Sequence, residues 1–196
     1  MKLYKSFEPS VSIILPTYNR VKLLKRAVKS VIEQSYKKWE LLIIDDGSND
    51  DSYQVSDRFL SRYENIRYLR HSNRKLPFTN NAGIAASIAE YISFLGSDDE
   101  YSKDYLSERI EFMKSNPEID LLHGGVKVIG DEMVPDKNDP SKKIHISECI
   151  VGGTFFGKRK VFQSLGGFND ILYSDDWEFL ERAVKNFKVK KVIYPT

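Results

Sequence analysis

Two adjacent carboxylates, Asp98 and Asp99, directly follow an apolar run of the chain. Two negative charges this close repel each other, and a cation beside them would offset the repulsion. Mg²⁺ and Mn²⁺ prefer carboxylate, water and phosphate oxygens, and one or two protein carboxylates suffice when a ligand supplies phosphates. The pair therefore fits either a divalent-cation site or a solvated acidic turn at the start of the next helix.

A second acidic cluster, Asp45-Asp46-Gly47-Ser48, also follows an apolar run. Asp46 and Gly47 favour a turn, and Ser48 or Asp50 is a suitable N-cap for the helix that follows. An aspartate at the end of a strand can also accept hydrogen bonds from a ribose or a base. Both interpretations, a capped turn and a nucleotide contact, are compatible with these residues.

The third cluster is Asp175-Asp176-Trp177-Glu178. Asp175 and Glu178 have the spacing of a capping box at the start of a helix. Asp176 is placed to act as a general base, which needs a carboxylate within hydrogen-bond reach of the proton it removes. Trp177 and the turn Gly166-Gly167-Phe168 offer stacking surfaces for a sugar ring, although packing in a core is the commoner role of an aromatic side chain.

The segments that must position these clusters alternate between short apolar runs, which are typical of buried strands, and segments whose apolar residues recur at helical spacing. Strands are predicted at residues 11–15, 39–44, 66–69 and 91–95, and helices at residues 21–34, from the 45–48 turn to about 63, and at 81–89. This alternation predicts an α/β fold with a mostly parallel central sheet and right-handed crossovers. Ligands bind at the carboxyl ends of such strands, and the first two clusters lie there.

The second half of the chain is less regular. We expect a helix ending near Asn116-Pro117, a short helix around Val161, a mobile loop over residues 130–143, a helix over residues 176–186, and strands over residues 120–129, 148–156 and 189–194. The whole chain, 1–196, is predicted to form a single domain, with a ligand-binding half at about 9–100 and a less regular half at about 101–196.

Composition excludes several classes of protein. Of 196 residues, 41% are hydrophobic, and 30 Lys and Arg face 28 Asp and Glu, which argues against a disordered chain and against a nucleic-acid binder. No apolar run approaches the ~20 residues that span a bilayer. The single cysteine, Cys149, is expected to be buried and structural, and it fits a reducing compartment. We therefore expect a cytoplasmic protein, with peripheral contact to the inner face of a membrane left open.

The clusters together resemble a known family. Val11-Ser12-Ile13-Ile14-Leu15-Pro16-Thr17-Tyr18-Asn19-Arg20, Asp45-Asp46-Gly47-Ser48, Ser97-Asp98-Asp99 and Gly166-Gly167-Phe168 with Asp175-Asp176 are similar to the motifs of family-2 glycosyltransferases of the GT-A fold. The resemblance covers about Pro9 to Tyr194. Any one motif is weak, but four in the family's order and spacing are specific.

The resemblance implies an inverting glycosyltransferase that moves a sugar from a nucleotide-diphospho-sugar, with UDP favoured, to a hydroxyl of a glycan or lipid-linked acceptor in polysaccharide or cell-surface glycan synthesis. It implies Mn²⁺ or Mg²⁺ as cofactor, Asp99 as metal ligand and Asp176 as catalytic base. It places the nucleotide-sugar on Pro16, Thr17, Tyr18, Arg20, Asp46, Lys75, Asn81 and Asp98, with Asp46 on the base and Asp98 on the ribose.

Three positions depart from the family pattern. Gly96 stands where many relatives carry a further aspartate, and Asp175 stands where glutamate is common. Asn80 replaces an arginine that steadies the diphosphate, and Arg74 or Lys75 is the candidate substitute. The missing arginine motivates an alternative hypothesis, a non-catalytic nucleotide-sugar-binding module of the same fold. A sugar nucleotidyltransferase would need a glycine-rich phosphate loop after the first strand, and residues 16–19 do not supply one.

Overall fold

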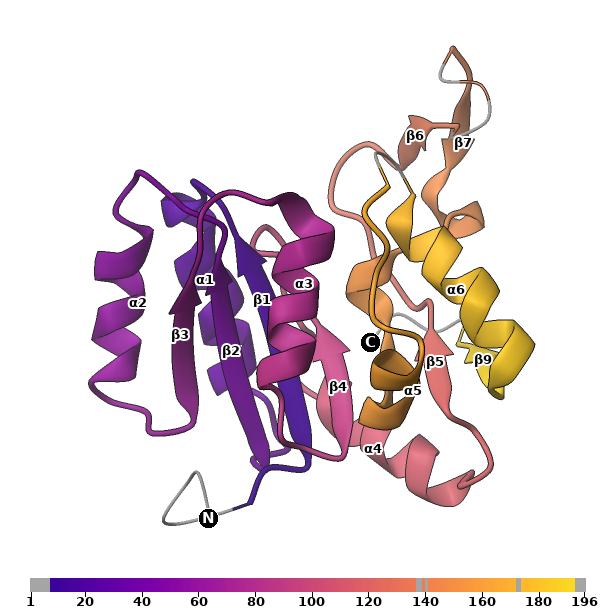
Figure 1. The fold of residues 1–196 in the computed structure, drawn as a ribbon, viewed down its shortest axis with the longest axis horizontal. Helices are drawn as coiled ribbons and strands as arrows, with labels where there is room; N and C mark the ends of the chain where they lie inside the picture. The colour runs from indigo at the N-terminus through magenta and orange to yellow at the C-terminus, as the bar shows by residue number, and fades with distance from the viewer. Residues whose placement is uncertain (1–7, 137–138, 140, 172–173, 193–196) are drawn as a thin grey trace.

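A seven-stranded sheet with the order β3-β2-β1-β4-β8-β5-β9 forms the centre of the molecule (Figure 1). The computed structural model describes residues 8–136, 139, 141–171 and 174–192. The strands are β1 (Val11–Thr17), β2 (Trp39–Asp45), β3 (Ile66–Arg70), β4 (Tyr91–Phe94), β5 (Leu121–His123), β8 (Phe156–Lys158) and β9 (Val189–Lys191). The helices are α1 (Val21–Ile32), α2 (Ser52–Leu60), α3 (Lys75–Ala86), α4 (Tyr105–Ser115), α5 (Arg159–Ser164) and α6 (Asp175–Asn186).

The predicted parallel sheet is confirmed for the first half of the chain. Strands β1 to β4 all run parallel in the order β3-β2-β1-β4. The second half extends the sheet with β8, which is antiparallel to both β4 and β5, and with β9, which is parallel to β5. The fold is therefore α/β with a mixed, mostly parallel sheet flanked by helices.

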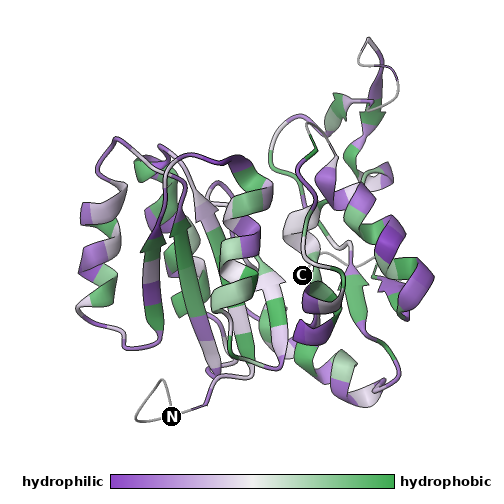
Figure 2. Cartoon of the chain, in the orientation of Figure 1, coloured by the Kyte–Doolittle hydropathy of each residue, from purple (hydrophilic) through white to green (hydrophobic). Residues whose placement is uncertain are grey.

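Alternate side chains of each strand pack against helices on opposite faces of the sheet. On one face, Val11, Ile13 and Leu15 of β1 belong to a buried cluster that includes the apolar stripes of α1 and α4. On the other face, Ile14 belongs to a cluster with residues of α3, α5 and α6. Both faces of the central strands are thus covered, and Figure 2 shows these strands as the most hydrophobic part of the chain.

Strand β1 extends beyond the end of its neighbour β4, and we use the term crevice for this carboxyl end of the two strands. The register of the two strands ends at the pair Ile14 and Phe94, whereas β1 continues to Thr17 beside β2. Pro16 therefore lies in the free end of β1, where its missing N–H costs no bond to β4. This position, between the first strand and the fourth in a sheet ordered 3-2-1-4, is where open α/β sheets bind ligands.

Helix α3 differs from the helix predicted at residues 81–89. It begins at Lys75 and ends at Ala86. The backbone N–H groups of Arg74 and Lys75 donate to the carboxylate of Asp46, at 2.6 and 3.0 Å. The helix is therefore started by a side chain 28 residues earlier in the chain, a contact that local pattern does not reveal.

Several predictions for the second half were wrong. The strand expected over residues 120–129 ends at His123, because Gly124 and Gly125 follow with φ angles of 87° and 79°. The strand expected over residues 148–156 is replaced by two short 3-10 turns, η1 (Ile146–Glu148) and η2 (Gly152–Thr154), before β8 begins.

The segment predicted as a mobile loop contributes a small hairpin. Strand β6 (Met133–Pro135) pairs antiparallel with β7 (Lys143–His145), which begins at the last residue of the predicted loop. The final strand ends at Lys191, and the end of the prediction, residues 193–194, lies outside the described residues. Within the described part of the chain, no helix combines the length and apolar character needed to cross a membrane.

Candidate active site

The loops after β1 and β2 are joined at the crevice. The backbone N–H of Asn19 donates to the hydroxyl of Ser48 at 2.9 Å, and Asn19 Oδ1 accepts from the N–H of Asn49. Asn19 adopts a left-handed φ of 52°, which asparagine tolerates better than most residues. These bonds fix Thr17, which is buried, and Tyr18, whose side chain is 44% exposed, at the mouth of the crevice.

Asp46 lies under the N-terminus of α3 rather than free in the crevice. Its two carboxylate oxygens accept the N–H groups of Arg74 and Lys75, and Nδ1 of His71 lies 3.4 Å from one of them. Gly47, with a φ of 81°, permits this close turn, because a Cβ there would lie 2.9 Å from the backbone nitrogen of Asn73. Each carboxylate oxygen can accept a second hydrogen bond, so a base contact stays a prediction.

Asp98 is held by two arginines of the first helical segment. Arg20 Nη1 lies 2.8 Å from Asp98 Oδ2, and Arg26 Nη2 donates to the backbone oxygen of Asp98 at 2.7 Å. Arg26 also pairs with Glu100 at 2.9 Å. Arg20 and Asp98, two residues predicted to bind the nucleotide-sugar, therefore contact each other directly.

Asp99 has a different environment from its neighbour. Its Oδ2 lies so close to Gly96 that a Cβ there would be 2.5 Å away. Burial, and secondarily the negative charge of Asp98, raise the pKa of Asp99, while Arg26 and Arg20 lower it less. No described residue donates a hydrogen bond to this carboxylate. A partly desolvated carboxylate without a protein donor, beside a second carboxylate, fits a hard divalent cation.

Gly96 leaves the room that the carboxylates of Asp98 and Asp99 occupy. A side chain at residue 96 would collide with the carboxylates of Asp98 and Asp99 as they stand. Within the described part of the chain, three or more metal-binding side chains nowhere gather into a cage. A cation held at Asp99 would therefore take most of its ligands from a bound diphosphate and water.

Three buried polar atoms in β1, in α3 and in the loop after β3 lack hydrogen-bond partners within the described residues. They are Thr17 Oγ1, His71 Nε2 and Asn80 Oδ1. His71 Nδ1 is 2.7 Å from the backbone oxygen of Ser72, which can only accept, so this nitrogen donates a hydrogen bond there. Buried polar atoms without a partner are costly, and a polar ligand would satisfy them. The sequence interpretation did not single out His71.

Lys75 and Asn81, two residues of α3 that were predicted to bind the nucleotide-sugar, have different surroundings. Lys75 is exposed with a left-handed φ of 72°, at the helix start. Asn81 is taken up by the turn that precedes α6: its amide accepts the N–H of Phe168 and donates to the carbonyl of the same residue, both at 2.8 Å. Gly167 packs against it, since a Cβ there would lie 2.1 Å from Asn81 Oδ1. A contact between Asn81 and the nucleotide-sugar stays a prediction.

Two glycines that sequence reasoning missed lie between Asp99 and Asp176. The backbone N–H of Gly152 donates to Asp176 Oδ2 at 3.0 Å, and a Cβ on Gly152 would be 3.1 Å from Asp176 Cβ. A Cβ on Gly153 would be 3.7 Å from Asp99 Oδ2. The η2 turn thus contacts the base candidate on one side and the metal-ligand candidate on the other. The pair Gly152-Gly153 in the sequence could have indicated a turn here, but the segment was predicted to be a strand.

Asp176 is oriented by the start of α6. Its Oδ1 accepts the N–H of Trp177 at 2.8 Å, and its Oδ2 accepts from Gly152. The N-cap of α6 is Ser174, with a φ of 61°, and not Asp175 as the capping-box interpretation had it. Asp175 is the first helical residue, and burial followed by the charge of Asp176 raises its pKa.

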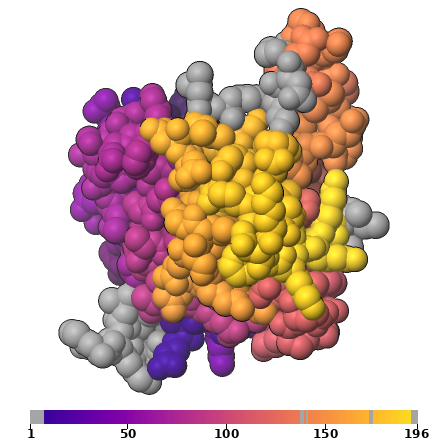
Figure 3. Space-filling view, turned by 45° about the vertical axis from the view of Figure 1, so that its right-hand side comes forward, coloured from indigo at the N-terminus to yellow at the C-terminus, as the bar shows by residue number. Residues whose placement is uncertain are grey.

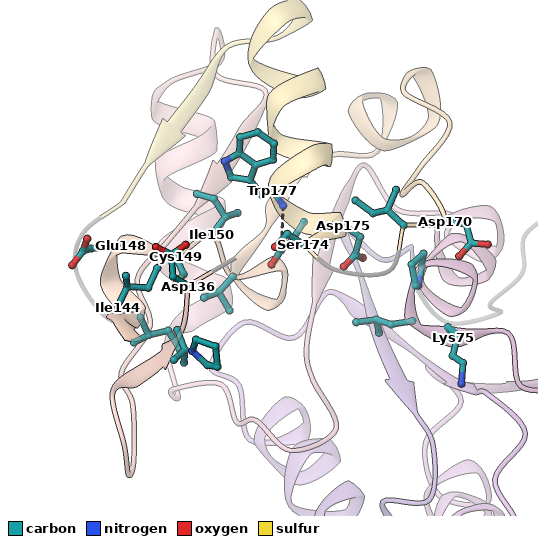
Figure 4. Close-up of a pocket in the computed structure, with 18 residues that line it drawn as sticks. Lys75, Asp136, Ile144, Glu148, Cys149, Ile150, Asp170, Ser174, Asp175 and Trp177 are labelled. Atoms are coloured by element: carbon teal, nitrogen blue, oxygen red, sulfur yellow. Dashed lines mark hydrogen bonds between the residues drawn. The ribbon is translucent and has the colours of Figure 1, made fainter. Parts of the chain in front are cut away.

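A pocket of about 840 Å³ adjoins this end of α6 (Figure 4). Asp175, Asp176 and Trp177 line it together with Lys75, and its far wall comes from the β6–β7 hairpin and the segment after it. In the space-filling view of Figure 3 the hairpin projects beyond the face formed by the last third of the chain. Cys149 lines this pocket and is only half-buried, so the prediction of a buried structural cysteine was wrong.

Solved structures share this fold over almost the whole chain. Residues 1–349 of TarS from S. aureus in complex with UDP superpose with a TM-score of 0.77 at 20% identity, covering 93% of this chain and 57% of that one. The mannosyltransferase PcManGT from Pyrobaculum calidifontis, in complex with GDP-Man and Mn²⁺, gives a TM-score of 0.76 at 19% identity, covering 97% of this chain and 55% of that one.

Among curated relatives, the chain is 34% identical over 113 residues to a putative teichuronic acid biosynthesis glycosyltransferase of Bacillus subtilis, which is 55% of this chain and 43% of that protein. The chain spans less than two thirds of the length of three further curated relatives, which are uncharacterized glycosyltransferases of Rickettsia species. The model of the family described as Glycosyl transferase family 2 matches residues 12–166. The chain therefore belongs to glycosyl transferase family 2 and has the GT-A fold.

Proposed function

We propose that this protein is an inverting glycosyltransferase that moves a sugar from a nucleotide-diphospho-sugar to an acceptor hydroxyl. The observation that carries the proposal is the η2 turn, whose Gly152 contacts Asp176 and whose Gly153 lies beside Asp99. A sugar resting on this turn would have the metal-ligand candidate on one side and the base candidate on the other. Inversion requires this opposition, because the acceptor must attack the anomeric carbon from the face opposite the leaving diphosphate.

The nucleotide would bind in the crevice between β1 and β4. Tyr18 is exposed there for stacking on a base, and Thr17 Oγ1 and His71 Nε2 are buried polar atoms for which a ligand would supply partners. Asp98, which pairs with Arg20, would contact the ribose. UDP is the favoured nucleotide, and the UDP complex of the structurally similar TarS supports that choice.

The diphosphate would lie near Asp99, which we propose holds Mn²⁺ or Mg²⁺ together with the phosphates. A bound divalent cation supplies a Lewis acid that offsets the charge developing on the leaving diphosphate. The Mn²⁺ in the similar mannosyltransferase supports this cofactor. Lys75 lies exposed at the start of α3 and is the candidate cation in place of the arginine that Asn80 replaces.

Asp176 would remove the proton of the attacking hydroxyl. A hydroxyl is a poor nucleophile until a base accepts its proton, and a positioned base contributes roughly 10²- to 10⁴-fold in rate. The bonds from Gly152 and Trp177 hold the Asp176 carboxylate in one orientation. The acceptor would approach through the pocket that Asp176 lines, and synthesis of a polysaccharide or cell-surface glycan is the process that the teichuronic acid relative supports.

Titration of the purified protein with nucleotide-sugars tests the proposal. UDP-, GDP- and dTDP-sugars are mixed with the protein with and without Mn²⁺, and binding and release of the nucleoside diphosphate are followed. We expect metal-dependent binding of one nucleotide class and slow hydrolysis of its sugar, with water replacing the acceptor. Binding without any turnover across a broad acceptor panel would favour the non-catalytic module that Asn80 motivates.

A further inference from the structure

The η2 turn combines the most flexible residue type with a role that needs a fixed position. Gly152 donates a hydrogen bond to Asp176, and Gly153 lies beside Asp99. Glycine has more conformational freedom than any other residue, so two glycines in succession hold no position by themselves. The hydrogen bonds of a short 3-10 turn also have poor geometry. Contacts from outside the two glycines must therefore hold the turn in place.

Thr154, the last residue of η2, supplies such a contact through its hydroxyl. The side chain is buried, and Thr154 Oγ1 donates to the carbonyl oxygen of Val151 at 2.6 Å. The same oxygen accepts the backbone N–H of Gly124, directly after β5, at 2.9 Å. A hydroxyl has one hydrogen to donate and two lone pairs, so both bonds can form together. One side-chain atom thus closes the turn from Val151 to Thr154 and attaches it to the end of β5.

Gly124 is a rigid anchor for this attachment. Its carbonyl oxygen accepts a hydrogen bond from Nη2 of Arg109 in α4 at 2.7 Å, and Arg109 is only 2% exposed. The guanidinium carbon of Arg109 lies 4.8 Å from the ring centroid of Tyr105. A Cβ on Gly124 would lie 2.6 Å from the carbonyl oxygen of Val192, so the backbone is closely packed here. Both backbone groups of Gly124 are held, and the bond from Thr154 ends in the protein core.

The next residue, Phe155, joins the turn to α6 by apolar contacts. Its ring is fully buried, and its centroid lies 5.6 Å from that of Phe179 and 6.3 Å from that of Phe168. An apolar side chain in place of Thr154 would leave these ring contacts unchanged. The hydroxyl of Thr154 can therefore be removed without removing the packing that folds this part of the chain.

We propose that Thr154 is a positioning residue for sugar transfer. Its hydroxyl holds the η2 turn so that the N–H of Gly152 keeps the Asp176 carboxylate aimed at the acceptor hydroxyl, and so that Gly153 stays beside Asp99. The inference rests on the proposed function and adds a residue that acts through Asp176. Because a displacement of about 1 Å can cost roughly 10²-fold in rate, a slightly shifted turn slows transfer in a protein that still folds.

Thr154→Val and Thr154→Ser form the first comparison. Valine keeps the shape of threonine and removes both hydrogen bonds, whereas serine keeps the hydroxyl. We expect Thr154→Val to lower kcat for transfer by roughly 10- to 100-fold and to leave KM for the nucleotide-sugar within about twofold of the unmodified protein. Thr154→Ser should recover most of the lost kcat. An unchanged kcat in Thr154→Val, a rise in KM alone, or no recovery in Thr154→Ser would overturn the proposal.

Ser12→Ala is the matched control for a loss of stability alone. Ser12 is also buried, and its hydroxyl donates to Glu40 at 2.6 Å and accepts the N–H of Ala89 at 3.1 Å. It lies near the amino end of β1, whereas Asp99 follows the carboxyl end of β4. Ser12→Ala should lower the melting temperature and leave kcat unchanged. An equal fall in kcat for Ser12→Ala and Thr154→Val would show that Thr154 has only a structural role.

Amide exchange separates this inference from the proposed function. The N–H of Gly152 is protected by its bond to Asp176 while the turn is held, so its exchange, followed by NMR, should be at least about tenfold faster in Thr154→Val and unchanged in Ser12→Ala. Faster exchange without any turnover by the unmodified protein would retain the tether and reject the transferase. Transfer at the full rate in Thr154→Val would retain the transferase and reject the positioning role. Should Thr154→Val unfold, Thr154→Ala against Thr154→Ser gives the same comparison, because these two variants differ only in the hydroxyl.

Discussion

Asp99 and Asp176 are both aspartates, yet their surroundings differ. Asp99 accepts no hydrogen bond from any described residue, and burial beside Asp98 raises its pKa. Asp176 accepts two backbone N–H groups, which stabilise a fixed carboxylate. The first suits a cation, and the second suits a base held in one orientation. Gly152 and Gly153 keep the space between them free of side chains.

Gly153→Ala tests that space. The new methyl group would lie 3.7 Å from Asp99 Oδ2, an ordinary van der Waals distance, so the fold should be unaffected. The methyl group would nevertheless take up room proposed for the transferred sugar. We expect binding of the nucleotide-sugar to weaken by about tenfold while UDP alone binds as before, measured by calorimetric titration. If the affinities for the nucleotide-sugar and for UDP fell equally, the methyl group would not act on the space proposed for the sugar.

Thr17→Val tests the nucleotide crevice. Thr17 Oγ1 is buried and has no hydrogen-bond partner among the described residues, so removing the hydroxyl should leave the melting temperature unchanged or slightly raised. If the hydroxyl binds the nucleotide, affinity for UDP should fall by roughly five- to tenfold, since one hydrogen bond contributes about 1 kcal/mol. Unchanged affinity would remove Thr17 from the nucleotide site.

At the scale of elements, the first half of the fold could be predicted because its signals are local. The apolar run of β1 and the helical spacing of Leu24, Val28 and Val31 in α1 follow from adjacent residues, and the structure buries all of them. The start of α3 could not be predicted, because Asp46 supplies its capping bonds from another loop. The η2 turn was missed because apolar residues around Gly152 and Gly153 imitate a strand.

In the candidate site, too, the residues with a local sequence signal could be predicted, and those that depend on distant contacts could not. Motif residues at the ends of β1, β2 and β4 meet at one edge of the sheet, as parallel topology requires. His71 was not anticipated because a single histidine after a polar strand carries no spacing signal. Its role depends on Asp46 and Ser72, which the fold brings beside it.

Strand β5 carries a pH dependence of stability. His123 is buried, and burial, followed by the charges of Lys191 and Arg109, lowers its pKa from 6.5 to about 4. The unfolded chain therefore binds a proton near pH 6.5 while the folded protein does not, so stability falls as the pH drops from 6.5 to 4. The slope is about 1.4 kcal/mol per pH unit, or roughly 3 kcal/mol across this range.

Urea unfolding of the protein and of His123→Gln at pH 7.5, 5.5 and 4.5 measures the contribution of His123 to the pH dependence of stability. The difference in unfolding free energy between the two proteins should change with pH by roughly the amount above, because the other titrating groups are common to both. A difference that is independent of pH would show that His123 is charged or exposed in the folded protein.

At the scale of the whole molecule, the two halves of the chain meet at the candidate site. The parallel half contributes Asp99 and the start of α3, and the second half contributes the η2 turn, Asp176 and most of the wall of the pocket beside it. Family 2 membership covers both halves, since the matching model runs from residue 12 to residue 166. The pocket beside Asp176 is lined by both halves, since Lys75, Leu76 and Pro77 of α3 lie in its wall together with residues of the second half.

The most direct test of this account compares two neighbouring aspartates in one assay of sugar transfer and donor binding. Asp176→Asn should lower transfer by at least about 10²-fold and leave donor affinity within a few-fold of the unmodified protein, because only the base is lost. Asp175→Asn, the matched control, should keep most of the transfer activity. Full transfer activity in Asp176→Asn, or its loss in Asp175→Asn alone, would contradict the account.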